Sequence, residues 1–264
     1  MRSVTHAIVA NVVLAGLLGS ARVEAQPSQH ALGFSIDAGL SGNRDDLLVP
    51  RMSSGPRLAL GPSYDGQLGP GALHVELHVA IAYVLDRDGY PGVAFDHALD
   101  AYYVFELGSA FGMRHALGPA LGLDADIAGL VSWDDAHAYW IGTRWLGVAW
   151  RAHVAAWRGA RWDFAAELPV VGLASRPDSY RHNKQDALNH VSFYFAEVYE
   201  DPQAVWWAQL QQLRLSVDLW HSASSGFVVS GWALGAEVRV AHAAEPGSAL
   251  AYRTTLRFRA AWGL

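Results

Sequence analysis

The sequence predicts an all-β fold, an antiparallel up-and-down transmembrane β-barrel of about ten strands with a long outer loop. First, apolar and polar side chains alternate in many segments, which is the period of a strand with two unlike faces. Second, no later run reaches the ~18 apolar residues that a transmembrane helix needs. Third, residues 252–264 end the chain as a strand with an apolar face and an arginine-rich face.

The N-terminal residues 1–25 have the pattern of a secretory signal peptide. An apolar run at residues 7–18 follows a basic start, and a small-residue cleavage sequence ends at Ala25. A membrane anchor is the alternative interpretation, but the run is too short to cross a bilayer as a helix. We therefore expect a mature chain that is a single barrel domain, residues 26–264.

Composition narrows the possible functions. The formal net charge is −6, which gives no sign of a nucleic-acid partner. The chain has no cysteine, so an exported form has no disulfide framework. Hydrophobic residues make up 52% of the chain and include 11 Trp, yet they are spread in alternation, as a transmembrane barrel requires.

The third predicted strand, residues 73–83, shows the alternation most clearly. Its odd positions are all apolar, and its even positions begin with His74, Glu76 and His78. The second strand is weaker because Pro62 cannot donate to a sheet ladder. The predicted strands cover residues 34–40, 56–64, 73–83, 97–107, 118–131, 140–157, 161–172, 205–221, 226–241 and 252–264.

Connection lengths fit an even strand count with both termini on the periplasmic side. Short connections alternate with longer ones, such as the polar loop predicted at residues 41–55 and the long outer loop at residues 173–204. Residues 190–199 alternate weakly, so eleven strands is an open count, and twelve would need one more. Two aromatic girdles are also expected, a periplasmic one of Trp157, Trp162, Trp220 and Trp262 and an outer one of Tyr83, Trp133, Trp140 and Trp206.

A soluble periplasmic barrel or sandwich with its apolar face inward is the alternative fold, because alternation alone does not say which face is inside. Strands of about 9–11 residues, long enough to cross a bilayer, favour the membrane barrel. Aromatic residues near strand ends and a chain that ends on a strand favour it as well.

With the apolar faces toward lipid, the opposite faces form a charged lumen. Acids concentrate on the third to seventh strands and arginines on the eighth to tenth, so we expect them to pair across a narrow interior and plug it. A conducting pore is the alternative. The predicted lumen charges are Asp37, Glu76, Asp100, Glu106, Asp124, Asp126, Arg151, Asp163, Glu167, Arg214, Asp218, Glu237, Arg239, Arg253, Arg257 and Arg259.

The segment at residues 252–264 resembles the closing strand of Gram-negative outer-membrane β-barrels. In that class the last residue is usually aromatic, whereas here it is Leu264. The resemblance implies a location in the outer membrane, with membrane lipids as partners. It also implies recognition by the barrel assembly machinery through the C-terminal strand.

Two further patterns bear on chemistry. His74 and His78 share a strand face with Glu76, a spacing that metal ligands can use but that structural hydrogen bonding explains better, so no metal or cofactor is expected. The sequence Asn189-His190-Val191-Ser192 resembles outer membrane phospholipase A, which implies His190 as base and Ser192 as nucleophile. The family's Asn-Gly after the serine is Phe-Tyr here, and a capping loop strand or amphipathic helix is the plainer interpretation.

Two functions therefore stand at this point. The first is a non-enzymatic outer-membrane barrel with a plugged lumen, serving envelope structure, adhesion or limited solute passage. The second is a lipid esterase or phospholipase-like hydrolase that uses His190 and Ser192. We expect the first, because the hydrolase depends on a four-residue resemblance.

Overall fold

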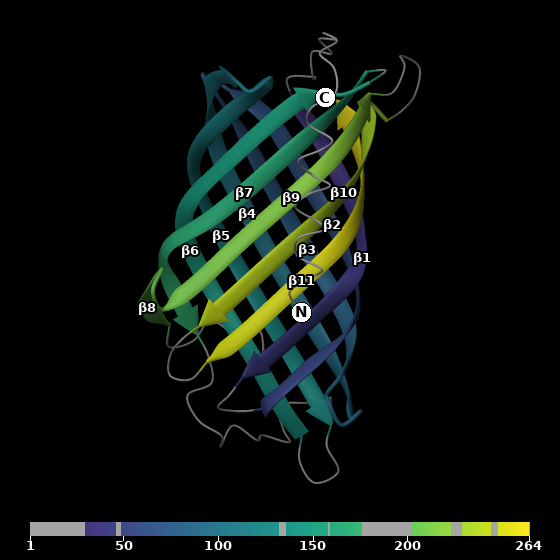
Figure 1. Cartoon of the computed structure of the whole chain (residues 1–264), viewed down its shortest axis with the longest axis vertical. Coiled ribbons are helices and arrows are strands. Elements are labelled where there is room, and N and C mark those ends of the chain that lie inside the picture. The colour runs from purple at the N-terminus through teal and green to yellow at the C-terminus, as the bar shows by residue number, and fades with distance from the viewer. Residues whose placement is uncertain are drawn as a thin grey trace.

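The structure, a computed structural model, describes residues 30–45, 49–131, 136–157, 159–175, 202–222, 229–243 and 248–263. It is a tall barrel of tilted strands (Figure 1). The strands are β1 (His30–Asp45), β2 (Val49–Leu68), β3 (Gly71–Leu85), β4 (Pro91–Ala110), β5 (Met113–Val131), β6 (Ala136–Ala155), β7 (Ala160–Ser175), β8 (Gln203–Trp206), β9 (Leu210–Ser222), β10 (Gly231–Ala243) and β11 (Ala249–Gly263).

Ten of these strands close into a ring in which neighbours are antiparallel. The order runs from β1 through β7 to β9, β10 and β11, and β11 pairs with β1 to close the barrel. The short β8 is an extra strand that pairs with β7. The prediction of an up-and-down barrel of ten strands is therefore confirmed. Among the described residues, no helix is long and apolar enough to span a membrane.

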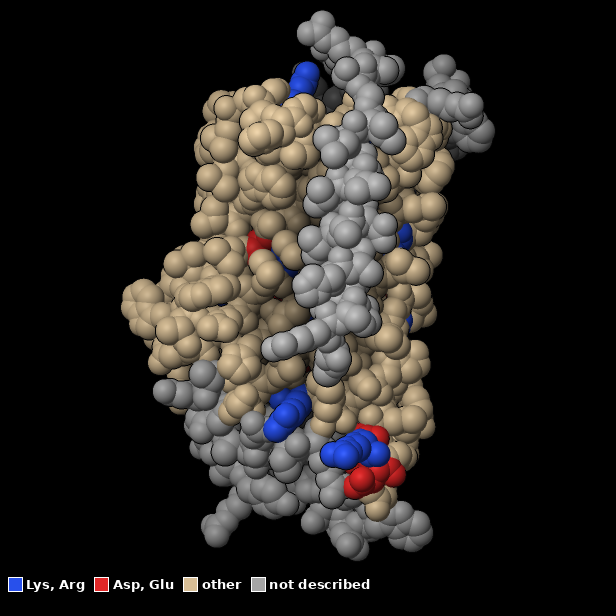
Figure 2. Space-filling model, in the orientation of Figure 1, with Lys and Arg blue, Asp and Glu red and all other residues tan. Residues whose placement is uncertain are grey.

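The apolar face of each strand points outward. On β11, Leu256 is 73% exposed and Phe258 45% exposed, while Arg257 and Arg259 between and beside them are buried. Figure 2 shows the result as a wall that is mostly uncharged, with charged side chains gathered toward its lower end. A soluble barrel would place the apolar face inside, so that alternative is wrong. Such an apolar wall fits a lipid environment, and the chain is an outer-membrane protein.

The two ends of the barrel differ in their connections. The tight turn from β4 to β5 lies at the end that also holds the C-terminus, at the top of Figure 1, and we call this the turn end. Phe111 and Gly112 in that turn both have positive φ, at 53° and 75°, as a two-residue type I′ hairpin turn requires. We call the opposite end the loop end; in outer-membrane barrels it faces the cell exterior.

Strands extend further toward the loop end than the alternation predicted. Much of the loop expected at residues 41–55 is strand, because β1 continues to Asp45 and β2 begins at Val49. Main-chain pairing persists there past the apolar region, and Ser53 donates a hydrogen bond to Asn43 across the two strands. Of the loop predicted at residues 173–204, the first three residues belong to β7 and the last two to β8. Residues 176–201 lie outside the described residues.

One side of the wall is interrupted between β7 and β9. The two strands pair from Ala160↔His221 to Glu167↔Arg214, and pairing resumes only where Val171 of β7 meets Trp206 of β8. Three residues of β7 (168–170) are thus opposed by seven on the other side (207–213). Pro169 lies in this stretch and has no backbone N–H to donate. The wall is therefore weakest in main-chain hydrogen bonds at this point, which we call the β7–β9 break.

The aromatic girdles match the structure in part. Trp157 is exposed in the turn from β6 to β7, and Trp206 is exposed on β8. Trp220, however, which was predicted in the periplasmic girdle, faces the lumen. Its ring lies 5.9 Å from the Arg259 guanidinium and 5.9 Å from that of Arg161, so it shares the lumen face of its strand. Trp133 lies outside the described residues.

Candidate functional site

The lumen is organised around Arg214 of β9. Its guanidinium contacts four carboxylates from four different strands: Glu76 at 2.7 Å, Asp100 at 2.6 Å, Glu167 at 3.3 Å and Glu237 at 2.8 Å. β3, which carries Glu76, lies on the opposite side of the ten-strand ring from β9. The planar fork of five donors lets one arginine serve several carboxylates at once. Arg214 therefore spans the barrel from wall to wall.

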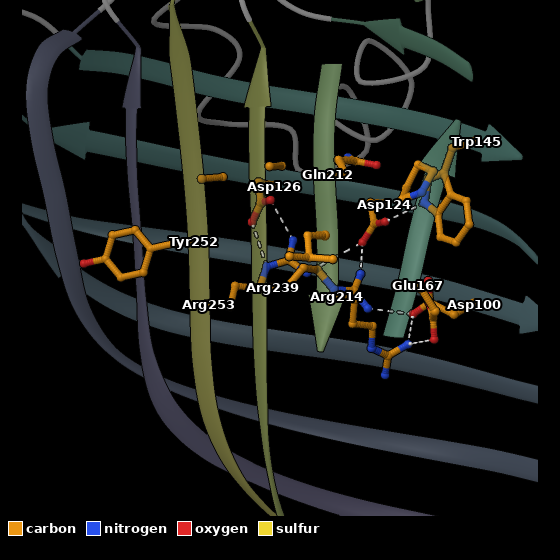
Figure 3. Close-up of a pocket in the computed structure, with 14 residues that line it drawn as sticks. Asp100, Asp124, Asp126, Trp145, Glu167, Gln212, Arg214, Arg239, Tyr252 and Arg253 are labelled. Atoms are coloured by element: carbon orange, nitrogen blue, oxygen red, sulfur yellow. Dashed lines mark hydrogen bonds and ion pairs between the residues drawn. The ribbon is translucent and has the colours of Figure 1, made fainter. Parts of the chain in front are cut away.

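Two more arginines reach the opposite wall from neighbouring strands. Arg239 of β10 lies 2.6 Å from Asp100 and also binds Asp124. Arg253 of β11 lies 2.7 Å from Asp126 on β5. Figure 3 shows Arg214, Arg239 and Arg253 extending from adjacent strands toward these carboxylates. The three cross-lumen arginines thus tie the β9–β11 wall to the β4–β5 wall.

A second group of ion pairs lies nearer the turn end. Arg259 contacts Glu76 at 2.5 Å, and Arg257 contacts Asp37 at 3.3 Å and also binds Glu237. These arginines alternate along the lumen face of β11 with apolar residues on its lipid face. Glu76 is shared between this group and Arg214, so the two groups form one continuous network.

The histidines of β3 belong to this network. His78 lies 3.0 Å from Glu76 and 3.4 Å from Asp37. His74 lies 2.8 Å from Asp65 and stacks on Tyr102 with ring centroids 4.7 Å apart. Both histidines thus have carboxylate partners. Within the described residues, no group of three or more His, Cys, Asp and Glu side chains is arranged to hold a metal ion.

The remaining predicted lumen charges lie at the edge of this network or outside it. Arg151 is half-buried, 3.6 Å from Asp65, with its guanidinium 5.2 Å from the Tyr102 ring centroid. Asp163 pairs with Arg161 at 3.1 Å, and Asp218 lies 3.9 Å from Arg259. Glu106 was placed in the lumen network, but it is exposed at the turn end beside a β-bulge and does not belong to the buried network.

Some lumen residues were missed by sequence reasoning. Arg57 and Asp96 form a two-pronged pair, with N–O distances of 2.8 and 2.6 Å. The fourth strand was predicted to start one residue after Asp96; extending its alternation backwards would have placed Asp96 inside. Trp145 also points inward and donates from Nε1 to Asp124 at 3.0 Å.

A glycine makes room for that indole. A Cβ at Gly122 would lie 2.3 Å from Cε2 of Trp145, so only glycine fits beneath the ring without a shift. The indole and Asp124 are held together in this way, and Asp124 in turn binds Arg239. The position of one cross-lumen arginine therefore depends on a residue without a side chain.

Two small cavities flank the Arg214–Glu167 pair. The loop-end cavity has a volume of about 20 Å³ and is lined by Asp126, Trp145 and Gln212 among others. The turn-end cavity has a volume of about 10 Å³ and is lined by His74, Tyr102 and Ser216 among others. Both are also lined by Glu167 and Arg214. Each is on the order of the space that one water molecule needs.

The predicted catalytic residues His190 and Ser192 lie outside the described residues. These two residues are therefore not part of the site described above. The lumen network carries no nucleophile–base pair of that kind among the contacts described. What it offers chemically is a dense set of paired charges that are buried in the lumen.

Comparisons with known proteins establish the fold class. No family model matches the chain, and no curated protein matches it either. Among solved structures, the outer membrane protease OmpT from Escherichia coli is similar with a TM-score of 0.55 and 6% identity, over 93% of this chain and 100% of that chain. The translocator domain of the autotransporter NalP from Neisseria meningitidis has a TM-score of 0.46 and 8% identity, over 98% and 95% of the two chains. The similarity to OmpT, with its TM-score above 0.5, shows that the chain has the fold of outer-membrane β-barrels.

Proposed function

We propose that this chain is a non-conducting outer-membrane barrel with a structural role, which presents its loop end at the cell surface for envelope architecture or adhesion. One observation carries the proposal. Charged side chains in the middle of the lumen are almost completely shielded from water: Glu76 is 1% exposed, Asp100 0% and Arg257 3%. In a water-filled pore such side chains would be solvated instead of packed against one another.

Limited solute passage is the weaker form of the same function. The two lumen cavities have volumes of about 20 and 10 Å³, and the Arg214–Glu167 pair lines both. Such spaces admit on the order of one water molecule each. A sugar or amino acid would have to displace cross-lumen ion pairs, and breaking a buried pair costs roughly 3–5 kcal/mol.

The partners follow from the two surfaces of the barrel. The exposed apolar face, including Leu256 and Phe258, supports contact with outer-membrane lipids. Strand β11 pairs with β1 to close the ring, which supports a role for this C-terminal strand in recognition by the barrel assembly machinery.

A liposome-swelling assay with small sugars tests the proposal. Liposomes that contain the folded wild-type protein should swell no faster than protein-free liposomes, because the lumen is filled. An Arg87→Ala protein should behave like the wild type, since Arg87 is exposed in the β3–β4 connection. Swelling of wild-type liposomes at rates that depend on sugar size would replace the structural role with a diffusion channel.

The second candidate function is lipid hydrolysis, and it is supported by the Asn189-His190-Val191-Ser192 sequence alone. Purified protein in mixed micelles should release no fatty acid from phospholipid, with or without calcium, if the structural role is right. Hydrolysis that a Ser192→Ala substitution abolishes would establish the hydrolase instead.

A further inference from the structure

Three buried acceptor oxygens in the loop-end cavity are left without a hydrogen-bond partner among the described residues. They are Oδ1 of Asp100, Oε2 of Glu167 and Oε1 of Gln212. All three residues line the same cavity, and each is more than nine-tenths buried. Two donor atoms of lining arginines, Nε of Arg239 and Nη2 of Arg253, also have no hydrogen-bond partner, but they lie 3.8 Å from Glu237 and 2.7 Å from Asp126. Buried acceptors are normally paired, so three in one cavity point to an occupant that donates hydrogen bonds.

In each of these three residues, another atom of the same side chain has a partner, and one oxygen has none. The other Asp100 oxygen, Oδ2, accepts from Arg214 and Arg239, both at 2.6 Å. On Glu167, Oε1 accepts from Arg214 at 3.3 Å. Gln212 donates from Nε2 to Oγ1 of Thr143 at 3.1 Å, and its carbonyl oxygen has no partner among the described residues.

The charge around the cavity favours a cation. Four carboxylates line it against three arginines, and the side chains concerned are shown in Figure 3. The lining carboxylates are Asp100, Asp124, Asp126 and Glu167, and the arginines are Arg214, Arg239 and Arg253. One additional positive charge would balance the set, and burial makes an unbalanced charge costly.

Size and donor count narrow the cation further. The volume of about 20 Å³ accepts a group of the size of a water molecule. The –NH₃⁺ group of a primary ammonium has that size, carries one positive charge and has three N–H donors, one for each free oxygen. Calcium takes six to eight oxygen ligands, which three free oxygens do not supply.

The cavity also lies beside the β7–β9 break. Pro169 of β7 and Leu213 of β9, from the two edges of that break, line it together with Glu167, the last β7 residue paired with β9. Figure 2 shows small areas of charged side chains within the otherwise uncharged wall at mid-height. A ligand with one end in the membrane could therefore reach the cavity from the side.

We propose that the loop-end cavity is a binding site for a primary ammonium group, supplied by a free amine or by the head group of a membrane amphiphile that enters at the β7–β9 break. The site does not depend on whether the barrel conducts. It would give this outer-membrane barrel a specific binding site for a small amine or a lipid head group.

The first test measures the thermal unfolding midpoint of the folded barrel in detergent micelles. Methylammonium chloride should raise the midpoint with a saturable dose dependence, because a ligand that binds only the folded state stabilises it. Tetramethylammonium chloride at equal ionic strength should not, because it has the charge but no N–H donor. Equal effects of the two salts, or no effect of methylammonium, would overturn the proposal and leave the cavity to water or a shared proton.

Two variants test whether methylammonium binds in the loop-end cavity. Gln212→Met keeps the size of the side chain and all lumen charges but removes the free carbonyl oxygen, so the apparent affinity for methylammonium should fall at least about tenfold. Gln211→Met is the matched control, since Gln211 is the exposed neighbour on the same strand and should leave the affinity unchanged. Equal affinities in the two variants would overturn the assignment to this cavity.

A comparison of lipids distinguishes the two sources. In nanodiscs of phosphatidylethanolamine, wild-type protein should unfold at a higher temperature than in nanodiscs of phosphatidylcholine, and Gln212→Met should remove that difference. This result would identify a lipid head group as the source. A response to methylammonium with no lipid difference would identify a free amine, and a lipid difference that persists in Gln212→Met would contradict binding of the head group at this site.

Discussion

The barrel closes by different means on two sides. At the seam between β1 and β11, main-chain pairing runs without a register shift from Ala31↔Gly263 to Asp45↔Ala249. Between β7 and β9, pairing stops at Glu167↔Arg214 and resumes only at β8. The seam is held by its backbone, whereas the β7–β9 break has a charged side chain, Arg214, at its edge.

This difference shows how an interrupted wall can be stable in a membrane. Lipid offers no hydrogen bonds to an open strand edge, so a gap in the ladder has to be compensated from inside the protein. Arg214 adds a side-chain link at the last paired position, because it connects Glu167 of β7 to Glu76 and Asp100 on distant strands. The lumen network is thus part of the wall as well as its filling.

The largest expected effect is the loss of Arg214. Arg214→Ala leaves four buried carboxylates without their shared partner, and removing one partner of a buried pair costs roughly 3–5 kcal/mol. Urea unfolding in detergent, followed by tryptophan fluorescence, should show this loss, and Arg257→Ala near the seam should lose less. Arg87→Ala should stay within about 0.5 kcal/mol of wild type. Similar unfolding free energies for Arg214→Ala and Arg87→Ala would contradict the idea that Arg214 stabilises the β7–β9 break.

A charge on the outer surface should distinguish the two sides next. Phe258→Arg places a cation in lipid at the seam and should cost about 2–4 kcal/mol of unfolding free energy. Leu168→Arg should cost less, because at the break the guanidinium can turn toward the acidic cavity next to Glu167. The same unfolding assay measures both, and an equal cost at the two positions would argue that the break is sealed from the cavity.

Much of the fold could be predicted from residues that alternate strictly. On β3, from Glu76 to Leu85, even positions are buried and odd positions are exposed, because each side chain meets either lipid or lumen and nothing else. Strand ends toward the loop end could not be predicted in this way. Beyond the apolar belt both faces meet polar surroundings, so the pattern disappears while main-chain pairing continues to Asp45.

The partners of the lumen charges were harder to predict than their positions. The sequence placed arginines on the last strands and acids on earlier ones, but which carboxylate meets which arginine depends on the stagger of the strands around the barrel. Arg214 reaches Glu76 across the ring, although the two residues are 138 positions apart in the chain. Alternation also could not reveal the β7–β9 break, because it follows from a missing ladder and not from a residue type.

A disulfide across the break gives the smallest of the stability effects. Leu168 and Leu213 would face each other if the β7–β9 ladder continued beyond Glu167↔Arg214. The chain has no cysteine, so the double variant Leu168→Cys and Leu213→Cys can form one disulfide within each molecule. Oxidation should stabilise the barrel by about 2 kcal/mol relative to its reduced form. Failure to form the bond in folded protein would show that the two strands are further apart than the ladder suggests.

The central claim is that the Arg214 network closes the lumen, and planar-bilayer conductance tests it most directly. Folded wild-type protein should give no stable single-channel steps. Arg214→Ala, inserted after its folded state has been verified on a gel without heating, should give discrete steps, because the residue that separates the two cavities is gone. Large and stable conductance steps from the unmutated protein would contradict the account.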